Sequence, residues 1–413
     1  MDISDHHMTD AGIVRPDVHI EVHVKSQSTV KRSEVRTHVL SLLDRHSTVL
    51  GSYRWTEFDD EFLTKNVESV AVADLTGPKL VDLKAHNLCI HIFSLNDDSP
   101  SMLALEEEEE LSAANHWLLP AAEFHGIWES LIYEEGIKTQ LLDYVSTTIF
   151  FSDRNVDSNL IAWNRVVLLH GPPGTGKTSL CKGLAQKLSI RLSDRYAHSQ
   201  FVEINSHSLF SKWFSEVHLH PSALKLVCML YTNIVESLTA ARSAAQAGTE
   251  PSDAIRVVNA VLTQLDQIKR HPNVVILTTS NVTEKIDLAF VDRADIKQYI
   301  GPPSASAIFH IYLSCLEELM KRHIIYPRQQ LLSLEELGTM DFMESDVTRL
   351  SLTLRNLAQR SEGLSGRALR KIPFLAHALY GKSSTMTVEV FLKAMERAVD
   401  KQRQEQASLV NCV

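Results

Sequence analysis

The first part of the chain alternates hydrophobic and polar residues over short stretches. Residues 18–24 and 88–95 both show this period of two, which is typical of half-buried strands. Between them, hydrophobic residues recur at helical spacing at Val35, Val39, Leu42 and Leu43. The pattern predicts a small mixed α/β module within residues 1–95.

The chain changes character after this module. Residues 96–100 read Asn-Asp-Asp-Ser-Pro, and five consecutive glutamates follow at 106–110. Repulsion between adjacent carboxylates favours an extended, solvated backbone. We therefore interpret residues 96–112 as an acidic interdomain linker, with a specific acidic docking site as the alternative.

Short apolar runs alternate with helical patterns in residues 113–303. We expect strands at 165–170, 201–205 and 273–278 and helices at 179–188 and 254–269. This alternation is typical of βαβ units, so the fold class is α/β with a mainly parallel sheet. The strand patterns then fade, and residues 304–413 are expected to form a helical lid domain with helices at 308–322, 333–337, 347–359, 366–380 and 387–401.

Composition narrows the classes of protein that remain. No apolar stretch approaches the ~20 residues that a membrane helix needs, and the acidic start of the chain does not resemble a secretory signal. Five scattered cysteines without Cys-x-x-Cys spacing are typical of reduced thiols. The net charge of -10 argues against general binding of nucleic acid. We expect a nuclear or cytoplasmic protein, without a membrane segment, whose partners are proteins.

A phosphate-binding motif lies between an expected strand and an expected helix. Residues 171–178 satisfy G-x-x-x-x-G-K-[ST], whose backbone N–H groups and following helix N-terminus bind phosphate oxygens. Lys177 is expected to contact the β- and γ-phosphates and Thr178 to ligate Mg²⁺. ATP and Mg²⁺ are therefore the predicted cofactors, and the predicted binding residues are Gly171, Pro172, Pro173, Gly174, Thr175, Gly176, Lys177 and Thr178.

Three further residues are candidates for catalytic positions near the phosphates. Asn281 follows an apolar strand, where its amide can orient the attacking water or simply cap the strand end. Arg293 can serve a neighbouring subunit's γ-phosphate as an arginine finger, or form a surface ion pair with an aspartate. Arg367 begins a helical stretch, from which it can reach the nucleotide or remain solvated.

Several motifs together resemble those of the pachytene checkpoint AAA+ ATPases, also called the thyroid hormone receptor interactor 13 family. They are the phosphate-binding loop, Phe-Ser-Lys-Trp-Phe-Ser-Glu216, Thr-Thr-Ser-Asn281, Phe-Val-Asp-Arg-Ala-Asp295 and Gly-Leu-Ser-Gly-Arg367. The resemblance implies a homohexameric AAA+ ring that uses ATP to remodel HORMA-domain proteins, which an adaptor helps the N-terminal module to deliver. It places this activity in meiotic recombination, chromosome synapsis and the spindle assembly checkpoint, in the nucleus, on chromosomes and also in the cytoplasm.

The resemblance also implies that Trp213 and Phe214 form a pore loop that grips a threaded substrate segment. Neighbouring side chains of a regular strand point to opposite faces, so at least one of these aromatic rings is expected to be exposed. Burial of both rings in a loop or helix is the alternative.

The chain departs from the family pattern at the Walker B position. The family has Asp and Glu after an apolar strand, whereas this chain has Asn233 and Ile234, and its residues 217–234 look foreign and too short. Isoleucine cannot activate water, so we expect ATP binding with strongly impaired hydrolysis. Glu236 and Asp266 lie nearby, but neither follows the strand directly. A different isoform or a misplaced exon boundary is the alternative origin of this stretch.

Three functions follow from these observations. The first is an ATP-dependent remodeller of HORMA-domain proteins. The second is a form that binds ATP, hydrolyses it poorly and traps its substrate. The third is a DNA-acting AAA+ ATPase, against which the acidic charge of the chain counts.

Overall fold

The computed structural model describes residues 15–75, 80–105, 108–134, 136–157, 159–196, 198–204, 226–232, 262–263, 266–267, 271, 273–281, 286, 288–381 and 383–410. Contacts divide the chain into two compact units. The first contains residues 1–98, 118–125 and 186–199, and the second contains residues 99–117, 126–185 and 200–413. The N-terminal module expected within residues 1–95 therefore shares its unit with two short segments from farther along the chain.

The first unit is built on a four-stranded sheet in the order β3-β4-β1-β6. The central strand β1 (Asp17–Val24) pairs antiparallel with β4 (Val67–Ala73) and parallel with β6 (Asn87–Phe93). The remaining strands of this unit are β3 (Arg54–Trp55) and the small pair β2 (Thr48–Leu50) and β5 (Leu80–Asp82). The strands β1 and β6 and the helix α1 (Arg32–Arg45) confirm the two strands and the helix predicted here. Hydrophobic residues of β1 and α1 belong to one core.

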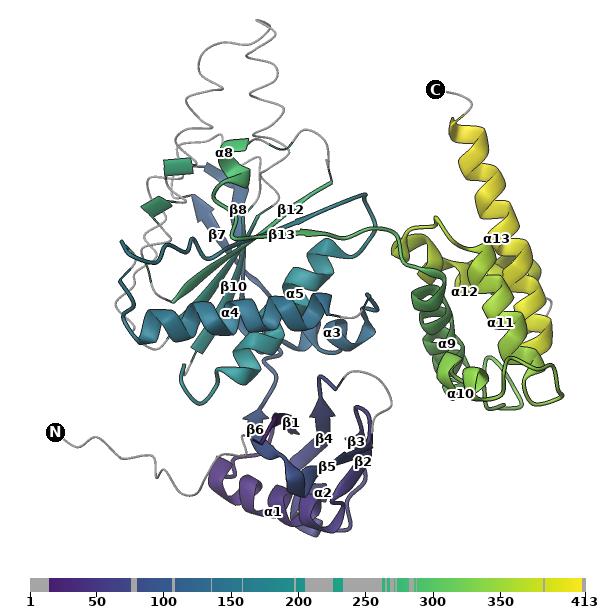
Figure 1. Cartoon of the computed structure of the whole chain (residues 1–413), viewed down its shortest axis with the longest axis horizontal. Coiled ribbons are helices and arrows are strands. Elements are labelled where there is room, and N and C mark those ends of the chain that lie inside the picture. Colours follow the sequence, from purple (N-terminus) through teal and green to yellow (C-terminus); the bar gives the residue numbers. More distant parts are fainter. Residues whose placement is uncertain are drawn as a thin grey trace, which may run out of the picture. The chain divides into compact units, whose positions relative to one another are not determined.

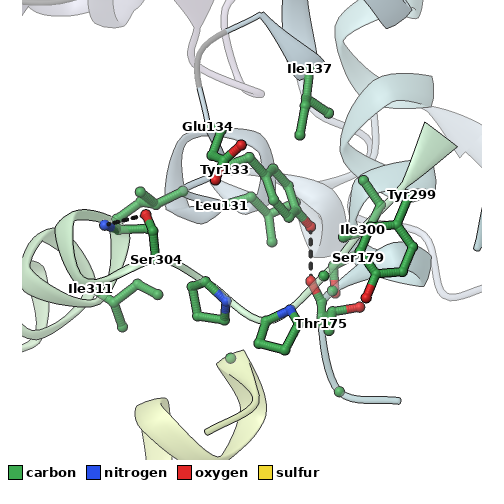
Figure 2. A pocket seen from close by; sticks show the side chains of 18 of the residues that line it. Leu131, Tyr133, Glu134, Ile137, Thr175, Ser179, Tyr299, Ile300, Ser304 and Ile311 are labelled. Carbon is green, nitrogen blue, oxygen red and sulfur yellow. Dashed lines mark hydrogen bonds between the residues drawn. The ribbon is translucent and has the colours of Figure 1, made fainter. Parts of the chain in front are cut away.

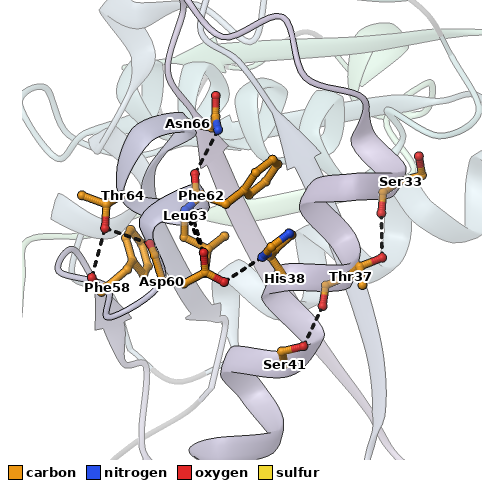
Figure 3. Close-up of polar contacts among 10 residues, drawn as sticks. All are labelled: Ser33, Thr37, His38, Ser41, Phe58, Asp60, Phe62, Leu63, Thr64 and Asn66. Atoms are coloured by element: carbon orange, nitrogen blue, oxygen red, sulfur yellow. Dashed lines mark hydrogen bonds and ion pairs between the residues drawn. The ribbon is translucent and has the colours of Figure 1, made fainter.

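The helix α2 (Glu61–Asn66) begins at a side-chain cap (Figure 3). Asp60 accepts hydrogen bonds from the backbone N–H groups of Phe62 at 2.8 Å and Leu63 at 3.3 Å. Its second carboxylate oxygen lies 2.7 Å from Nδ1 of His38 on α1. The cap therefore satisfies the free N–H groups at the start of α2 and also ties α2 to α1.

The last residues of α5 (Lys177–Arg191) belong to this unit and form largely buried ion pairs with it. The side chains of Glu21 and Lys187 are 8% and 4% exposed, and Nζ of Lys187 lies 2.6 Å and 2.8 Å from the two carboxylate oxygens. Arg191 donates to Asp74 at 2.7 Å in the same way. Paired charges offset each other's desolvation, so these side chains can stay largely buried within the first unit.

Strands between residues 101 and 299 form a seven-stranded sheet in the order β13-β9-β12-β11-β10-β8-β7 (Figure 1). The pairs β13 with β9, β9 with β12, and β12 with β11 are parallel, which confirms the predicted mainly parallel sheet. Its strands are β7 (Ser101–Leu105), β8 (Glu108–Leu119), β9 (Val166–His170), β10 (His198–Ile204), β11 (Leu226–Thr232), β12 (Val274–Ser280) and β13 (Ile296–Tyr299).

The acidic stretch at 96–112 differs from the expected linker. Ser101–Leu105 and Glu108–Leu119 pair as an antiparallel hairpin, and β7 ends the order of the sheet. An extended backbone is also the conformation that strand pairing needs, and a partner strand is present here. The extended backbone was predicted correctly, and its place in a sheet was not.

Two segments of the central region are described in part. The apolar run at 226–231 forms a strand, β11, in the middle of the sheet. Residues 262–263 and 266–267 are helical, and the rest of the helix expected at 254–269 lies outside the described residues.

The lid is helical, as predicted. Its helices are α9 (Ala305–Lys321), α10 (Leu334–Thr339), α11 (Arg349–Arg360), α12 (Gly366–Tyr380) and α13 (Val388–Val410). Serine side chains cap α9, α10 and α12 by accepting from backbone N–H groups of the first turn. Hydrophobic residues of all five helices form one core. Among the described helices, none is both long and apolar enough to cross a bilayer.

Candidate nucleotide-binding site

The loop between β9 and α5 needs glycine at three positions. Gly171, Gly174 and Gly176 have φ angles of 142°, 78° and 92°, which side-chain-bearing residues rarely adopt. A Cβ on Gly171 would lie 2.2 Å from the carbonyl oxygen of Ile300. The loop therefore packs directly against the backbone after β13, and this close approach shapes the phosphate cradle that the motif predicts.

Lys177 points back into this loop. Its Nζ donates to the carbonyl oxygens of Gly171 and Pro172, both at 2.8 Å, and the residue is 5% exposed. Thr175 Oγ1 also donates to the carbonyl of Pro172, at 3.0 Å. Thr178 is exposed on the first turn of α5, beside Lys177. The loop thus combines a held ammonium group, three glycines and a hydroxyl at a helix N-terminus, which fits a nucleotide phosphate with Mg²⁺.

The ammonium group also acts on the residue before the loop. Burial lowers the pKa of His170, and the nearby charge of Lys177 lowers it further. The ring of His170 lies 5.5 Å from that of Tyr299 on β13. A neutral His170 adds no charge to compete with Lys177 for an anion.

A cavity of about 740 Å³ adjoins the loop (Figure 2). Its walls come from four parts of the chain: the segment between α3 (Ile127–Ser130) and α4 (Ile137–Asp153), the loop itself, the stretch after β13, and the lid. The apolar lining includes Leu131, Ile132, Ile137, Ile300 and Ile311. Among the described residues that line it, Glu134 carries the one carboxylate. A large cavity of mixed apolar and polar lining beside a phosphate loop fits a nucleotide base and ribose.

The lid reaches the loop through the start of α12. The backbone N–H of Arg367 donates to the carbonyl of Gly174 at 3.0 Å, and Arg367 lines the cavity. A Cβ on Gly174 would lie 2.9 Å from Oγ of Ser365, which caps α12. Arg367 was predicted from its motif, and the structure brings it to the loop; its contact with nucleotide stays a prediction.

Asn281 follows β12 directly, and β12 pairs with β9 so that Ser280 lies opposite His170. The N–H of Gly171 donates to the carbonyl of Ser280 at 3.2 Å. Asn281 is exposed one residue beyond that bond. The sheet register therefore sets Asn281 at the start of the phosphate loop, where its predicted role in orienting water remains to be tested.

Arg293 lies elsewhere. Its guanidinium group binds both carboxylate oxygens of Asp266, at 3.1 Å and 2.9 Å, and donates to the carbonyl of Ala289 at 2.7 Å. Arg293 does not line the cavity described above. The aspartate partner is therefore Asp266 and not a sequence neighbour, and the arginine-finger role stays a prediction about a second subunit.

Several predicted residues lie outside the described residues, namely Trp213, Phe214, Asn233 and Ile234. The strand β11 can be placed, because Thr232 lies opposite Thr278 of β12. The two residues that follow Thr232 in the sequence are Asn233 and Ile234, neither of them acidic.

Part of the cavity lining that packs against the loop was not predicted from the sequence. Tyr133 and the stretch at 298–304 line the cavity, but no motif marked them. Residues 301–303, Gly-Pro-Pro, were a weak signal, because such a sequence after an apolar strand often marks a tight turn or close backbone approach. Nothing comparable marked Tyr133.

A parallel sheet with a glycine loop after β9, closed by a helical lid, defines an AAA+ P-loop protein. Residues 167–302 match the ATPase family associated with various cellular activities (AAA). Residues 13–98 match the TRIP13 N-terminal domain, and residues 304–403 match the TRIP13-like AAA+ ATPase lid C-terminal domain. The chain therefore belongs to the pachytene checkpoint protein 2 (TRIP13) family, as its close relatives also show.

The chain is similar to the pachytene checkpoint protein 2 homolog of Danio rerio, with 83% identity over 430 aligned positions that cover all of both chains. It is 62% identical over 416 positions to the Homo sapiens homolog, covering 95% of each. The solved structure of C. elegans PCH-2 matches with a TM-score of 0.75 at 31% identity, covering 94% of this chain and 100% of that one. Because 430 aligned positions exceed the 413 residues of the chain, this chain has gaps relative to the Danio rerio homolog.

Proposed function

We propose that the chain binds ATP with Mg²⁺ and, as a homohexameric ring, remodels HORMA-domain proteins delivered by an adaptor. The observation that carries nucleotide binding is the phosphate loop with Lys177 held inside it, next to a cavity that the lid helps to line. Family membership supports the remodelling activity, together with the motifs that surround Trp213 and Arg293. On the same basis we propose roles in meiotic recombination, chromosome synapsis and the spindle assembly checkpoint, in the nucleus, on chromosomes and in the cytoplasm.

The residues of the site would divide the work. Lys177 and the loop N–H groups would hold the phosphates, and Thr178 would hold Mg²⁺, which offsets phosphate charge when bound. Arg367 would contact the nucleotide from the lid, and Asn281 would orient water. Arg293 would exchange its pairing with Asp266 for the nucleotide of a neighbouring subunit.

A second function is favoured by the end of β11. This strand is the neighbour of β12 in the sheet, where the family has its Walker B carboxylates, but Asn233 and Ile234 follow it in the sequence. Losing a general base lowers rates by ~10²–10⁴, while binding through the phosphate loop does not need that base. We infer a chain that binds ATP, hydrolyses it slowly and holds its substrate.

One experiment separates these functions. Steady-state phosphate release and conversion of an adaptor-bound HORMA protein would be measured for this chain and for the double variant Asn233→Asp with Ile234→Glu. If the impaired form is correct, the double variant turns over at least tenfold faster and gains remodelling. Equal rates in both proteins would contradict the proposal of an impaired form. Turnover that rises on adding DNA and falls with salt would favour a DNA-acting ATPase instead.

A further inference from the structure

The segment between α3 and α4 touches the phosphate loop through one tyrosine. The hydroxyl of Tyr133 donates to the carbonyl oxygen of Thr175 at 3.2 Å, and Figure 2 shows this ring directed at the loop. A Cβ on Gly176 would lie 2.6 Å from the same hydroxyl and 3.3 Å from Cδ2 of Leu131. Tyr133 therefore packs against Gly176, where a side chain on the loop would collide with the tyrosine hydroxyl.

The same segment is held by the lid. Nη2 of Arg370 on α12 donates to the carbonyl oxygen of Ser130, the last residue of α3. One turn earlier on α12, the N–H of Arg367 binds the carbonyl of Gly174. Ser130 through Tyr133 thus forms a strap between the lid and the loop, and all of these residues belong to the second compact unit.

The position of the Thr175 carbonyl matters for phosphate binding. The peptide that joins Thr175 to Gly176 is planar and trans, so its C=O and N–H point in opposite directions. A hydrogen bond that holds this carbonyl toward Tyr133 aims the N–H of Gly176 the other way. Phosphate loops bind their ligand with such N–H groups.

We propose that Tyr133 and Arg370 are positioning residues for nucleotide binding, which link the orientation of the loop peptide after Thr175 to the seating of the lid. The inference rests on the proposed nucleotide binding. Neither side chain needs to touch the phosphates: Tyr133 orients the peptide, and Arg370 holds the strap that carries Tyr133. Burial raises the pKa of Tyr133, so its hydroxyl keeps the proton that it donates.

The first test is Tyr133→Phe, which removes one oxygen and keeps the ring. One neutral hydrogen bond corresponds to roughly two- to tenfold in affinity. We therefore expect Mg²⁺ with ADP or with ATPγS to bind roughly two- to tenfold more weakly by calorimetry, while the Tm of the nucleotide-free protein stays unchanged. The matched control is Tyr380→Phe, also at a partly buried tyrosine and away from the cavity, which should change neither quantity.

The second test combines Tyr133→Phe with Arg370→Met. If the strap links the two residues, the loss in the double variant is smaller than the product of the two single losses. Arg370→Lys keeps a donor for Ser130 and should recover part of the affinity.

Several results would overturn the inference. These are wild-type affinity in Tyr133→Phe, a Tm loss in its nucleotide-free form that matches the affinity loss, or strictly multiplicative losses in the double variant. Failure of the proposed function looks different, since the unmodified chain would then bind neither nucleotide and would match Lys177→Ala.

Discussion

Single residues at the phosphate loop are defined by what lies against them. Gly171 could be replaced in an isolated loop at the cost of backbone strain alone, since its φ is 142°. In the folded chain a side chain there would also meet the carbonyl oxygen of Ile300. The motif therefore predicts a glycine at position 171, and the packing against the stretch after β13 explains why a larger residue does not fit there.

Gly171→Ala should accordingly lose nucleotide binding and destabilise the chain by on the order of 2–4 kcal/mol, because backbone cannot move aside as a flexible side chain can. Thermal unfolding and calorimetry with Mg²⁺ and ADP measure the two effects. Gly338→Ala in α10 is the matched control: no atom lies within 4 Å of its Cβ position, so Tm should stay the same or rise. Wild-type nucleotide affinity in Gly171→Ala would contradict the packing argument.

Among the elements, α5 serves two compact units. Its first residues, Lys177 and Thr178, complete the phosphate loop, while Lys187 and Arg191 near its end bind carboxylates of the first unit. Along α5, Leu180, Leu184 and Leu188 lie on one hydrophobic face and are at most 1% exposed. Within the first unit, the end of α5 therefore forms the seat of β1.

Glu21→Gln tests the importance of that seat. It leaves Lys187 buried without its carboxylate partner, which should cost about 3–5 kcal/mol in the free energy of unfolding. Chemical denaturation measures the loss. Replacing both residues by methionine should restore much of it, because no buried charge remains unpaired. Glu318→Gln in α9, which breaks an exposed pair with Arg322 just after the helix, is the control and should leave the midpoint unchanged. An equal midpoint for Glu21→Gln would show that this ion pair does not stabilise the unit.

At the scale of the whole molecule, the order of the sheet brings distant motifs together. The strand β9 lies between β13 and β12, so the loop after β9 meets the ends of both neighbours. The lid adds Arg367 from a position almost two hundred residues later in the sequence. A nucleotide bound here would contact both parts and should favour the conformation that assembles into a ring.

Sedimentation velocity checks this expectation. With Mg²⁺ and ATPγS, the chain should assemble to about six times its subunit mass, as proposed for its family, and Lys177→Ala should not, because the ammonium group at the loop is gone. Lys371→Ala, at an exposed lysine of α12, is the control and should assemble normally. Assembly of Lys177→Ala at the same nucleotide concentration would separate ring formation from the phosphate loop.

The sequence by itself determined the local features. Hydrophobic periodicity located most of the helices and strands, because burial of one face imposes a period of two or 3.6 on the residues. The phosphate loop was predicted residue by residue, because its glycines, Lys177 and Thr178 are contiguous in the chain. The sequence also shows that Asn233 and Ile234, neither of them acidic, follow Thr232, and the prediction of impaired hydrolysis rests on these two residues.

Only the tertiary structure decided which distant residues meet. The contact of Tyr133 with Thr175, the pairing of Arg293 with Asp266 and the ion pair of Glu21 with Lys187 join residues far apart in the sequence, and no periodicity records them. Residues 101–105 and 108–112 were expected in a linker and instead lie in a strand pair for the same reason, because strand pairing depends on a partner strand. A local pattern states what a segment can form, and the packing of the whole chain selects its neighbours.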